Sequence, residues 1–243
     1  MSTRSIHVFP AVNDLAAFFA DLLSKEMARL KTGEFFSLAL SGGSTPKAVF
    51  EYLSQHKQHI PWQRLQLFWG DERCVPPEHP ESNYNMVQNS LLRHISIPSG
   101  HIFRIKGEAE PQAESVRYAE TIVEKIPSVN KVPRFDLVML GMGEDGHTAS
   151  LFPGNINVGG SQSLFEVATH PVSGQRRITA TLELINNAKT IVFLVTGQSK
   201  AEMLSRILEK KEGWERYPAS MVKANHGKVL WLTDNAAASK LKI

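Results

Sequence analysis

Apolar residues follow two patterns that alternate along the chain. Residues 35–40, 65–70 and 135–141 are short, almost continuous apolar runs, which are typical of strands buried on both faces of a sheet. Residues 14–31 instead repeat large apolar residues at helical spacing: Leu15, Phe18, Phe19, Leu22, Leu23, Met27 and Leu30. The same reasoning predicts further strands at 5–10 and 228–233 and further helices at 46–53, 82–95, 113–126 and 199–210.

Buried strands that alternate with helices predict an α/β fold, Rossmann-like, with a largely parallel sheet and helices on both faces. We expect residues 176–197 to add two strands about a turn at Asn186 and Asn187, and residues 71–84 to form a long loop. No repeat, low-complexity segment or linker divides the chain, so residues 1–243 are predicted to form a single α/β domain.

Four loops carry glycine and polar side chains directly after a predicted strand. They follow Leu40, Trp69, Leu140 and Thr196. Because ligands bind outside the C-terminal ends of strands in open α/β sheets, we expect these loops to meet at one site.

The composition is that of an ordinary soluble protein, with 42% hydrophobic residues, 21% charged residues and a net charge of +3. Lysine and arginine are dispersed, which argues against a nucleic-acid partner. No apolar run has membrane-spanning length, and residues 1–10 lack the apolar core of a signal peptide. The single cysteine, Cys74, excludes an internal disulfide and favours a reducing, cytoplasmic location.

Residues 141–146, G-M-G-E-D-G, match the glycine fingerprint of dinucleotide-binding proteins. A dinucleotide site needs a long helix after the glycines, but Pro153 and Gly154 interrupt the chain too early. Glu144 and Asp145 would also place negative charge beside a pyrophosphate. The pattern therefore argues against NAD, and we expect no cofactor.

We interpret Gly141, Gly143 and Gly146 as a sharp exit from a strand that presents Asp145 and His147. A carboxylate and an imidazole two residues apart can form an acid–base pair. The alternative is a turn whose polar side chains bond only to nearby backbone. A metal site is disfavoured, because no other histidine or carboxylate has clear ligand spacing.

Two segments have the features of anion-binding sites. Gly42, Gly43, Ser44 and Thr45 lie between a strand and a predicted helix that begins at Pro46, where free N–H groups and the helix dipole favour a phosphate. Ser44 or Thr45 can cap this helix or donate a hydroxyl. The alternative is an ordinary capped helix after a tight turn.

Lys200 is predicted in the first turn of a helix, where the dipole disfavours a cation unless an anion lies between them. Arg177 can add a second positive charge. The alternative for Lys200 is a solvated surface lysine. Two anion-binding segments together favour a small phosphorylated substrate.

Asp71, Glu72 and Arg73 directly follow a predicted strand, where they either bind substrate or pair with each other on a solvated loop. Cys74 beside them raises the hypothesis of a thiol nucleophile, but no base or oxyanion hole can be assigned to it. A serine esterase is disfavoured, because the sequence contains no G-x-S-x-G.

Four blocks of the sequence resemble the 6-phosphogluconolactonase family: residues 38–53, 68–87, 135–154 and 176–204. The similarity runs from about Ala16 to Leu232. This family belongs to a sugar-phosphate superfamily with a Rossmann-like sheet and no nucleotide cofactor, which also includes glucosamine-6-phosphate deaminase. The resemblance implies hydrolysis of 6-phosphoglucono-1,5-lactone, without a metal and without a membrane or nucleic-acid partner.

The resemblance also implies residue roles. His147 would be the general base on water. Asp145 would orient His147 or bind a sugar hydroxyl, and Arg73 would stabilise developing negative charge or hold the substrate. The 6-phosphate would lie among Gly42, Gly43, Ser44, Thr45, Arg177 and Lys200. Arg176 is the alternative to Arg177, because the segment before it is less proline-rich than the family pattern.

Two other functions stay open. The deaminases follow D-G-H with a segment whose glutamate pairs with the histidine, and Phe152 occupies that position here. A phenylalanine cannot relay a proton, which disfavours the deaminase. A non-catalytic sugar-phosphate sensor is the other alternative. Monomer and homodimer are equally compatible with the sequence.

Overall fold

The computed structural model describes residues 3–57, 60–154 and 163–242. Within these residues the main element is a seven-stranded sheet whose strands all run parallel to their neighbours. The order is β1 (Thr3–Phe9), β12 (Lys228–Asp234), β11 (Thr190–Val195), β8 (Leu137–Leu140), β2 (Phe36–Leu40), β3 (Leu65–Trp69) and β5 (Ile102–Phe103). The predicted α/β, Rossmann-like fold with a largely parallel sheet is confirmed.

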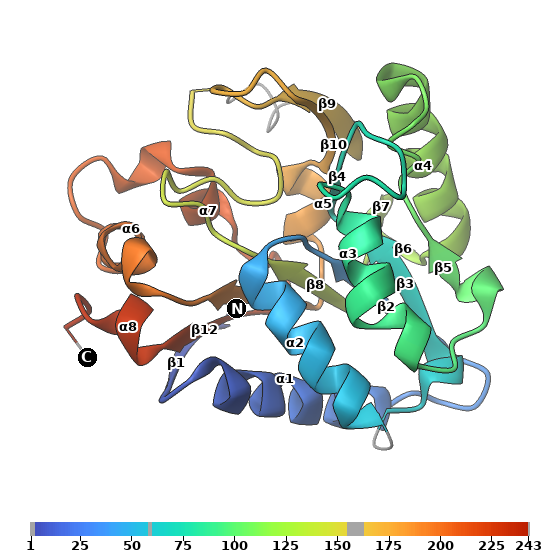
Figure 1. Ribbon diagram of the computed structural model, residues 1–243, viewed down its shortest axis with the longest axis horizontal. Coiled ribbons are helices and arrows are strands. Elements are labelled where there is room, and N and C mark those ends of the chain that lie inside the picture. Colours follow the sequence, from blue (N-terminus) through green and yellow to red (C-terminus); the bar gives the residue numbers. More distant parts are fainter. Residues whose placement is uncertain (1–2, 58–59, 155–162, 243) are drawn as a thin grey trace.

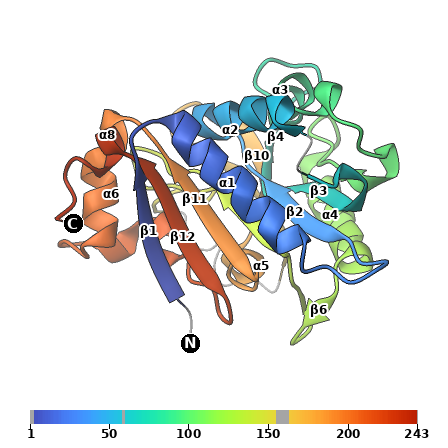
Figure 2. The same cartoon turned by 90° about the horizontal axis from the view of Figure 1, so that it is seen from below.

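Helices pack around the sheets. In chain order the described helices are α1 (Val12–Met27), α2 (Ser44–Gln55), α3 (Asn83–Ser90), α4 (Pro111–Lys125), α5 (Leu182–Asn186), α6 (Ala201–Leu208), α7 (Pro218–Met221) and α8 (Asn235–Ala238). Helix α1 crosses one face of the sheet, as Figure 2 shows from below. The apolar positions that predict this helix include Leu15, Phe19 and Leu23, which are fully buried against the sheet.

A second, antiparallel sheet lies in the upper part of Figure 1, away from α1 at the bottom. Within the described residues it consists of β4 (Asp71–Arg73), β10 (Arg176–Ala180) and β9 (Phe165–Thr169), and α4 packs on it. A hairpin of β6 (Ser128–Val129) and β7 (Val132–Pro133) completes the strands that the structure describes. No helix in the described part of the chain is both long and apolar enough to span a membrane.

Two sequence predictions are wrong in this region. The segment 71–84 begins with strand β4, whose three residues pair with β10. Residues 176–197 do form two strands, β10 and β11, but the strands belong to different sheets and the short helix α5 separates them. Leucine and glutamate favour helix, and Leu184 and Ile185 of α5 are buried, so tertiary packing selects the helix over a hairpin.

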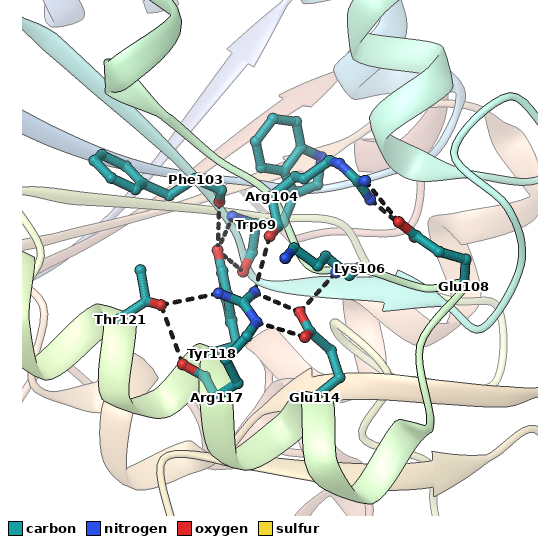
Figure 3. A network of polar contacts seen from close by, with 9 residues as sticks. All are labelled: Trp69, Phe103, Arg104, Lys106, Glu108, Glu114, Arg117, Tyr118 and Thr121. Atoms are coloured by element: carbon teal, nitrogen blue, oxygen red, sulfur yellow. Dashed lines mark hydrogen bonds and ion pairs between the residues drawn. The ribbon is translucent and has the colours of Figure 1, made fainter.

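The carboxyl end of β3 is fixed by side chains of α4 (Figure 3). The buried Tyr118 hydroxyl accepts a hydrogen bond from Trp69 N at 2.9 Å and donates one to the Phe103 carbonyl at 2.9 Å. Burial raises the pKa of this hydroxyl, so it stays protonated and able to donate. Nearby, buried Glu114 binds Arg117 through two contacts of 2.6 Å. This network sets the point from which β4 departs.

Candidate active site

The four loops predicted to converge do meet in one pocket of about 190 Å³. Its walls come from residues 41–46, 141–143 and 194–196, together with Asp71, Arg73, Asn83, His147, Ala149, Arg177 and Lys200. These segments follow β2, β3, β8 and β11, so the carboxyl edge of the large sheet forms most of the site. The small sheet closes one side through Asp71, Arg73 and Arg177.

Asp145 and His147 form a direct pair at the mouth of this pocket. His147 Nδ1 lies 2.6 Å from Asp145 Oδ1, and the His147 backbone N–H donates to the same oxygen at 3.2 Å. An ionised carboxylate only accepts, so the imidazole carries its proton on Nδ1 and leaves Nε2 free to act as a base. Burial raises the pKa of Asp145, but the hydrogen bond and charge of His147 outweigh burial and hold this pKa below its ordinary value.

The glycines of residues 141–146 serve this pair. A Cβ on Gly143 would lie 2.2 Å from His147 Nδ1 and 2.3 Å from Asp145 Oδ1, so only glycine leaves room for the two side chains. Gly146 has a φ of +80°, and its α-carbon packs against Tyr217. Two of the three glycines of the apparent nucleotide fingerprint are thus explained by local packing and backbone conformation.

Arg73 is held between the two sheets by its neighbour Glu72. The Glu72 carboxylate is buried and accepts hydrogen bonds from the backbone of Arg73, Asn83 and Tyr84 at 2.7–2.8 Å and from Ser82 Oγ at 3.1 Å. It therefore ties β4 to the first turn of α3. Arg73 lines the pocket, and its Nε is buried without a hydrogen-bond partner among the described residues.

Asn83 and Asp71 are pocket residues that sequence reasoning missed or left uncertain. Asn83 Nδ2 donates to the Asp71 carbonyl at 2.9 Å, and Ser150 Oγ donates to Asp71 Oδ2 at 2.7 Å. Asn83 also touches the glycine turn, since a Cβ on Gly42 would lie 1.9 Å from Asn83 Oδ1. Asp71 belongs to the charged triplet of residues 71–73, for which the sequence left substrate binding open. Nothing in the sequence around Asn83 indicates that it lines the pocket.

The first anion-binding segment differs from the expectation in its cap. Helix α2 begins at Ser44, and its N-cap is Gly43, which has a φ of +109° and no side-chain hydrogen bond. Ser44 is thus inside the helix and caps nothing. Thr45 Oγ1 contacts Thr196 Oγ1 at 2.7 Å, which joins this segment to the loop that carries Lys200.

Lys200 ends a 3₁₀ turn, Gln198–Lys200, and is the N-cap of α6, one residue before the predicted place. Its Nζ lies 3.9 Å from Glu144, so a carboxylate supplies the anion that its position at the helix end favours. Arg177 reaches the pocket, whereas Arg176 turns to Glu110 at 4.0 Å. Burial, followed by the charge of Arg73, lowers the pKa of Arg177.

Cys74 is half-buried and is not among the residues that line the pocket. Burial raises the pKa of its thiol, which opposes formation of a nucleophilic thiolate. The geometry therefore gives no support to the thiol hypothesis.

Comparison with known proteins shows which family this chain belongs to. A family model described as glucosamine-6-phosphate isomerases/6-phosphogluconolactonase matches residues 10–231. The chain belongs to this family. The predicted resemblance to the 6-phosphogluconolactonase branch is confirmed by a 6-phosphogluconolactonase of Haemophilus influenzae, 48% identical over 206 residues, which are 84% of this chain and 87% of that protein.

Solved structures of the family share the whole architecture. A protein described as devB has a TM-score of 0.91 at 39% identity, with 98% of this chain and 99% of that chain covered. The 6-phosphogluconolactonase of Trypanosoma brucei has a TM-score of 0.88 at 28% identity, with 99% of this chain and all of that chain covered. A monomeric glucosamine-6-phosphate deaminase, at 23% identity and a TM-score of 0.80, shares the fold.

Proposed function

We propose that this protein is a 6-phosphogluconolactonase that hydrolyses 6-phosphoglucono-1,5-lactone to 6-phosphogluconate. The observation that carries the proposal is one pocket lined by His147, Arg73, Arg177 and Lys200, with Asp145 2.6 Å from His147 Nδ1. A general base and three cations suit a substrate that is a cyclic ester and carries a phosphate dianion. Relatives named 6-phosphogluconolactonase at 43% and 48% identity support the same reaction.

His147 Nε2 takes a proton from a water molecule, and the water oxygen attacks the lactone carbonyl carbon. Negative charge then develops on the carbonyl oxygen, where Arg73 stabilises it. When the bond between this carbon and the ring oxygen breaks, the imidazolium returns its proton to the ring oxygen. Asp145 holds His147 Nδ1 and stabilises the imidazolium during both steps.

The substrate phosphate occupies the side of the pocket formed by Gly42, Gly43, Ser44, Thr45, Arg177 and Lys200. Backbone N–H groups at the start of α2 and the side chains of Arg177 and Lys200 supply donors there. Lys200 exchanges its contact with Glu144 for the phosphate. The reaction needs no cofactor, because a lactone carbonyl is already electrophilic.

The deaminase is disfavoured by Phe152, which occupies the place of a proton-relaying glutamate. A sensor is disfavoured because binding alone has no need of a histidine oriented by a carboxylate. One cysteine in 243 residues suits a reducing compartment, so we propose the cytoplasm as the location. We also propose that residues 1–243 form a single domain.

The test is hydrolysis of the phosphorylated lactone above its spontaneous rate, compared with His147→Ala. We expect the variant to lose roughly 10²–10⁴-fold in kcat, the usual contribution of a positioned acid–base group. It should stay folded, because His147 lies on a loop at the pocket mouth. Near-normal activity of folded His147→Ala would disprove the assignment, and ammonia release from glucosamine 6-phosphate would revive the deaminase.

A further inference from the structure

Phe152 is buried in an unusual environment. It is 2% exposed, yet it lies outside the contiguous apolar core formed by the other large buried side chains. The Phe152 ring packs against the side chains of two histidines and an arginine. A fully buried phenylalanine that packs against polar groups of a candidate active site calls for an explanation beyond core packing.

Three side chains lie around the Phe152 ring. The His147 ring centroid lies 5.1 Å from that of Phe152 with an interplanar angle of 52°, and the His170 ring meets Phe152 edge-on at 5.1 Å and 81°. The Arg177 guanidinium carbon stands 5.7 Å from the Phe152 ring centre. Phe152 is therefore a spacer between the loop that carries the base and strand β10, which carries the arginine.

Both functional side chains need this support. The bond from His147 Nδ1 to Asp145 fixes one atom of the imidazole, but a second contact is required to fix the plane of the ring. Arg177 makes only long hydrogen bonds among the described residues, 3.3 Å to Gln175 and 3.5 Å to Ser150. A cation placed over an aromatic face gains a favourable interaction, which compensates for those weak bonds.

Hydrogen bonds hold the segments on which these contacts depend. His170 Nδ1 accepts hydrogen bonds from the backbone N–H groups of Val172 and Ser173 at 3.3 and 3.1 Å, so its ring is tied to the turn after β9. Two residues before Phe152, Ser150 Oγ donates to Asp71 at 2.7 Å and the Ser150 backbone N–H donates to the Thr179 hydroxyl of β10 at 3.1 Å. The loop that carries Phe152 is therefore attached to the small sheet.

We propose that Phe152 is a positioning residue of the lactonase reaction, which holds the His147 imidazole in its reactive orientation and the Arg177 guanidinium over the phosphate side of the pocket. The proposal rests on the functions assigned above to His147 and Arg177. It adds a side chain that touches no substrate and still governs both the rate and the binding of the phosphate.

The test compares Phe152→Leu with Phe135→Leu. Phe135 is equally buried, at 2% exposure, but packs edge-on against Phe68 inside the apolar core. We expect Phe152→Leu to lower kcat by about tenfold or more, because small displacements of catalytic groups are costly. Its KM should rise for the phosphorylated lactone and change little for unphosphorylated gluconolactone. Phe135→Leu should lose stability while its kcat stays within about twofold of the wild type.

A double variant identifies the path of the effect. If Phe152 acts on binding through Arg177, the rise in KM caused by Phe152→Leu disappears in an Arg177→Ala background. Phe152→Met conserves volume and gives the same comparison if the leucine variant does not fold. Wild-type kcat and KM in a folded Phe152 variant would overturn the inference, whereas full activity of His147→Ala would overturn the proposed function instead.

Discussion

The surroundings of the Asp145 side chain affect its pKa in two opposite directions. It is 48% exposed at the pocket mouth, and partial burial raises its pKa. The hydrogen bond and charge of His147 lower the pKa by more, so the net shift is downward. A carboxyl group whose pKa is lower in the folded protein than in the unfolded chain stabilises the fold when it is ionised.

This shift predicts the pH dependence of an Asp145→Asn variant. In the wild type, the contribution of Asp145 is fully present above its ordinary pKa of 3.8 and is lost as the pH falls through the lower folded value. The difference in unfolding free energy between wild type and Asp145→Asn should therefore be largest near neutral pH and shrink below pH 3.8. Urea denaturation across this range measures it.

Glu120→Gln is the matched control for this experiment, because Glu120 is an exposed carboxylate on α4, away from the pocket. Its stability difference from the wild type should stay small at every pH. A difference between wild type and Asp145→Asn that does not change with pH would mean that His147 does not stabilise the Asp145 carboxylate.

At the level of elements, the loop after β8 shows how glycine shapes a site without binding a nucleotide. Gly143 leaves space for the side chains of Asp145 and His147, and Gly146 lets the chain turn beneath Tyr217. The Thr148 hydroxyl then donates to the Gly141 carbonyl at 2.8 Å and closes the loop. Packing therefore requires glycine at 143, and packing together with a positive φ requires it at 146.

Gly143→Ala should displace the His147–Asp145 pair while leaving the fold in place. The added methyl would lie 2.2 Å from His147 Nδ1, so the imidazole must move. We expect a loss of about tenfold or more in kcat, because the pair loses its alignment, and a loss of about 1–3 kcal/mol in stability from overpacking. Steady-state kinetics and thermal unfolding measure the two effects.

Gly100→Ala provides the comparison. A Cβ at Gly100 meets nothing within 4 Å, and this glycine does not line the pocket. The control should keep wild-type kinetics. If Gly143→Ala does so as well, the pair tolerates displacement and does not depend on the glycine.

Most of the large sheet and its site edge were predictable because these strands are apolar runs of their own, whereas the two-residue edge strand β5 is too short to give such a signal. Strand β8 and the loop that presents His147 are examples, since the pattern of residues 135–147 contains both the strand and the turn. The small sheet was not predictable, because β4 is a charged segment of three residues that becomes a strand only by pairing with β10, about 100 residues later. Asn83 joins the site through its hydrogen bond to the Asp71 carbonyl of β4, which also depends on that strand being in place.

For the whole molecule, the pocket lies where the two sheets meet. Gly70 is the link: its N–H donates to the Leu40 carbonyl at 2.8 Å in the large sheet, and its carbonyl accepts from Ala180 N of the small sheet at 2.7 Å. The large sheet supplies the two anion-binding segments, and the small sheet supplies Arg73 and Arg177. An anion bound between them connects both sheets, so binding should stabilise the folded protein as a whole.

Lys200→Ala tests this arrangement through the phosphate. Because we propose that Lys200 contacts the substrate only through its phosphate, the variant should raise KM for the phosphorylated lactone by about one to two decades, the equivalent of a charge-assisted bond of about 1.5–3 kcal/mol. Unphosphorylated gluconolactone should be affected far less. Inorganic phosphate should raise the melting temperature of the wild type, and less so that of Lys200→Ala.

The matched control is Lys47→Ala. Lys47 lies in the first turn of α2, is 56% exposed and pairs with Glu51, and it is not a pocket-lining residue. If general positive charge near α2 were responsible for phosphate binding, Lys47→Ala would weaken it too. We expect wild-type KM and wild-type stabilisation by phosphate in this control. Equal losses of Lys200→Ala on both lactones would show instead that Lys200 serves the sugar ring or the fold, because a contact with the phosphate alone cannot affect a substrate that lacks one.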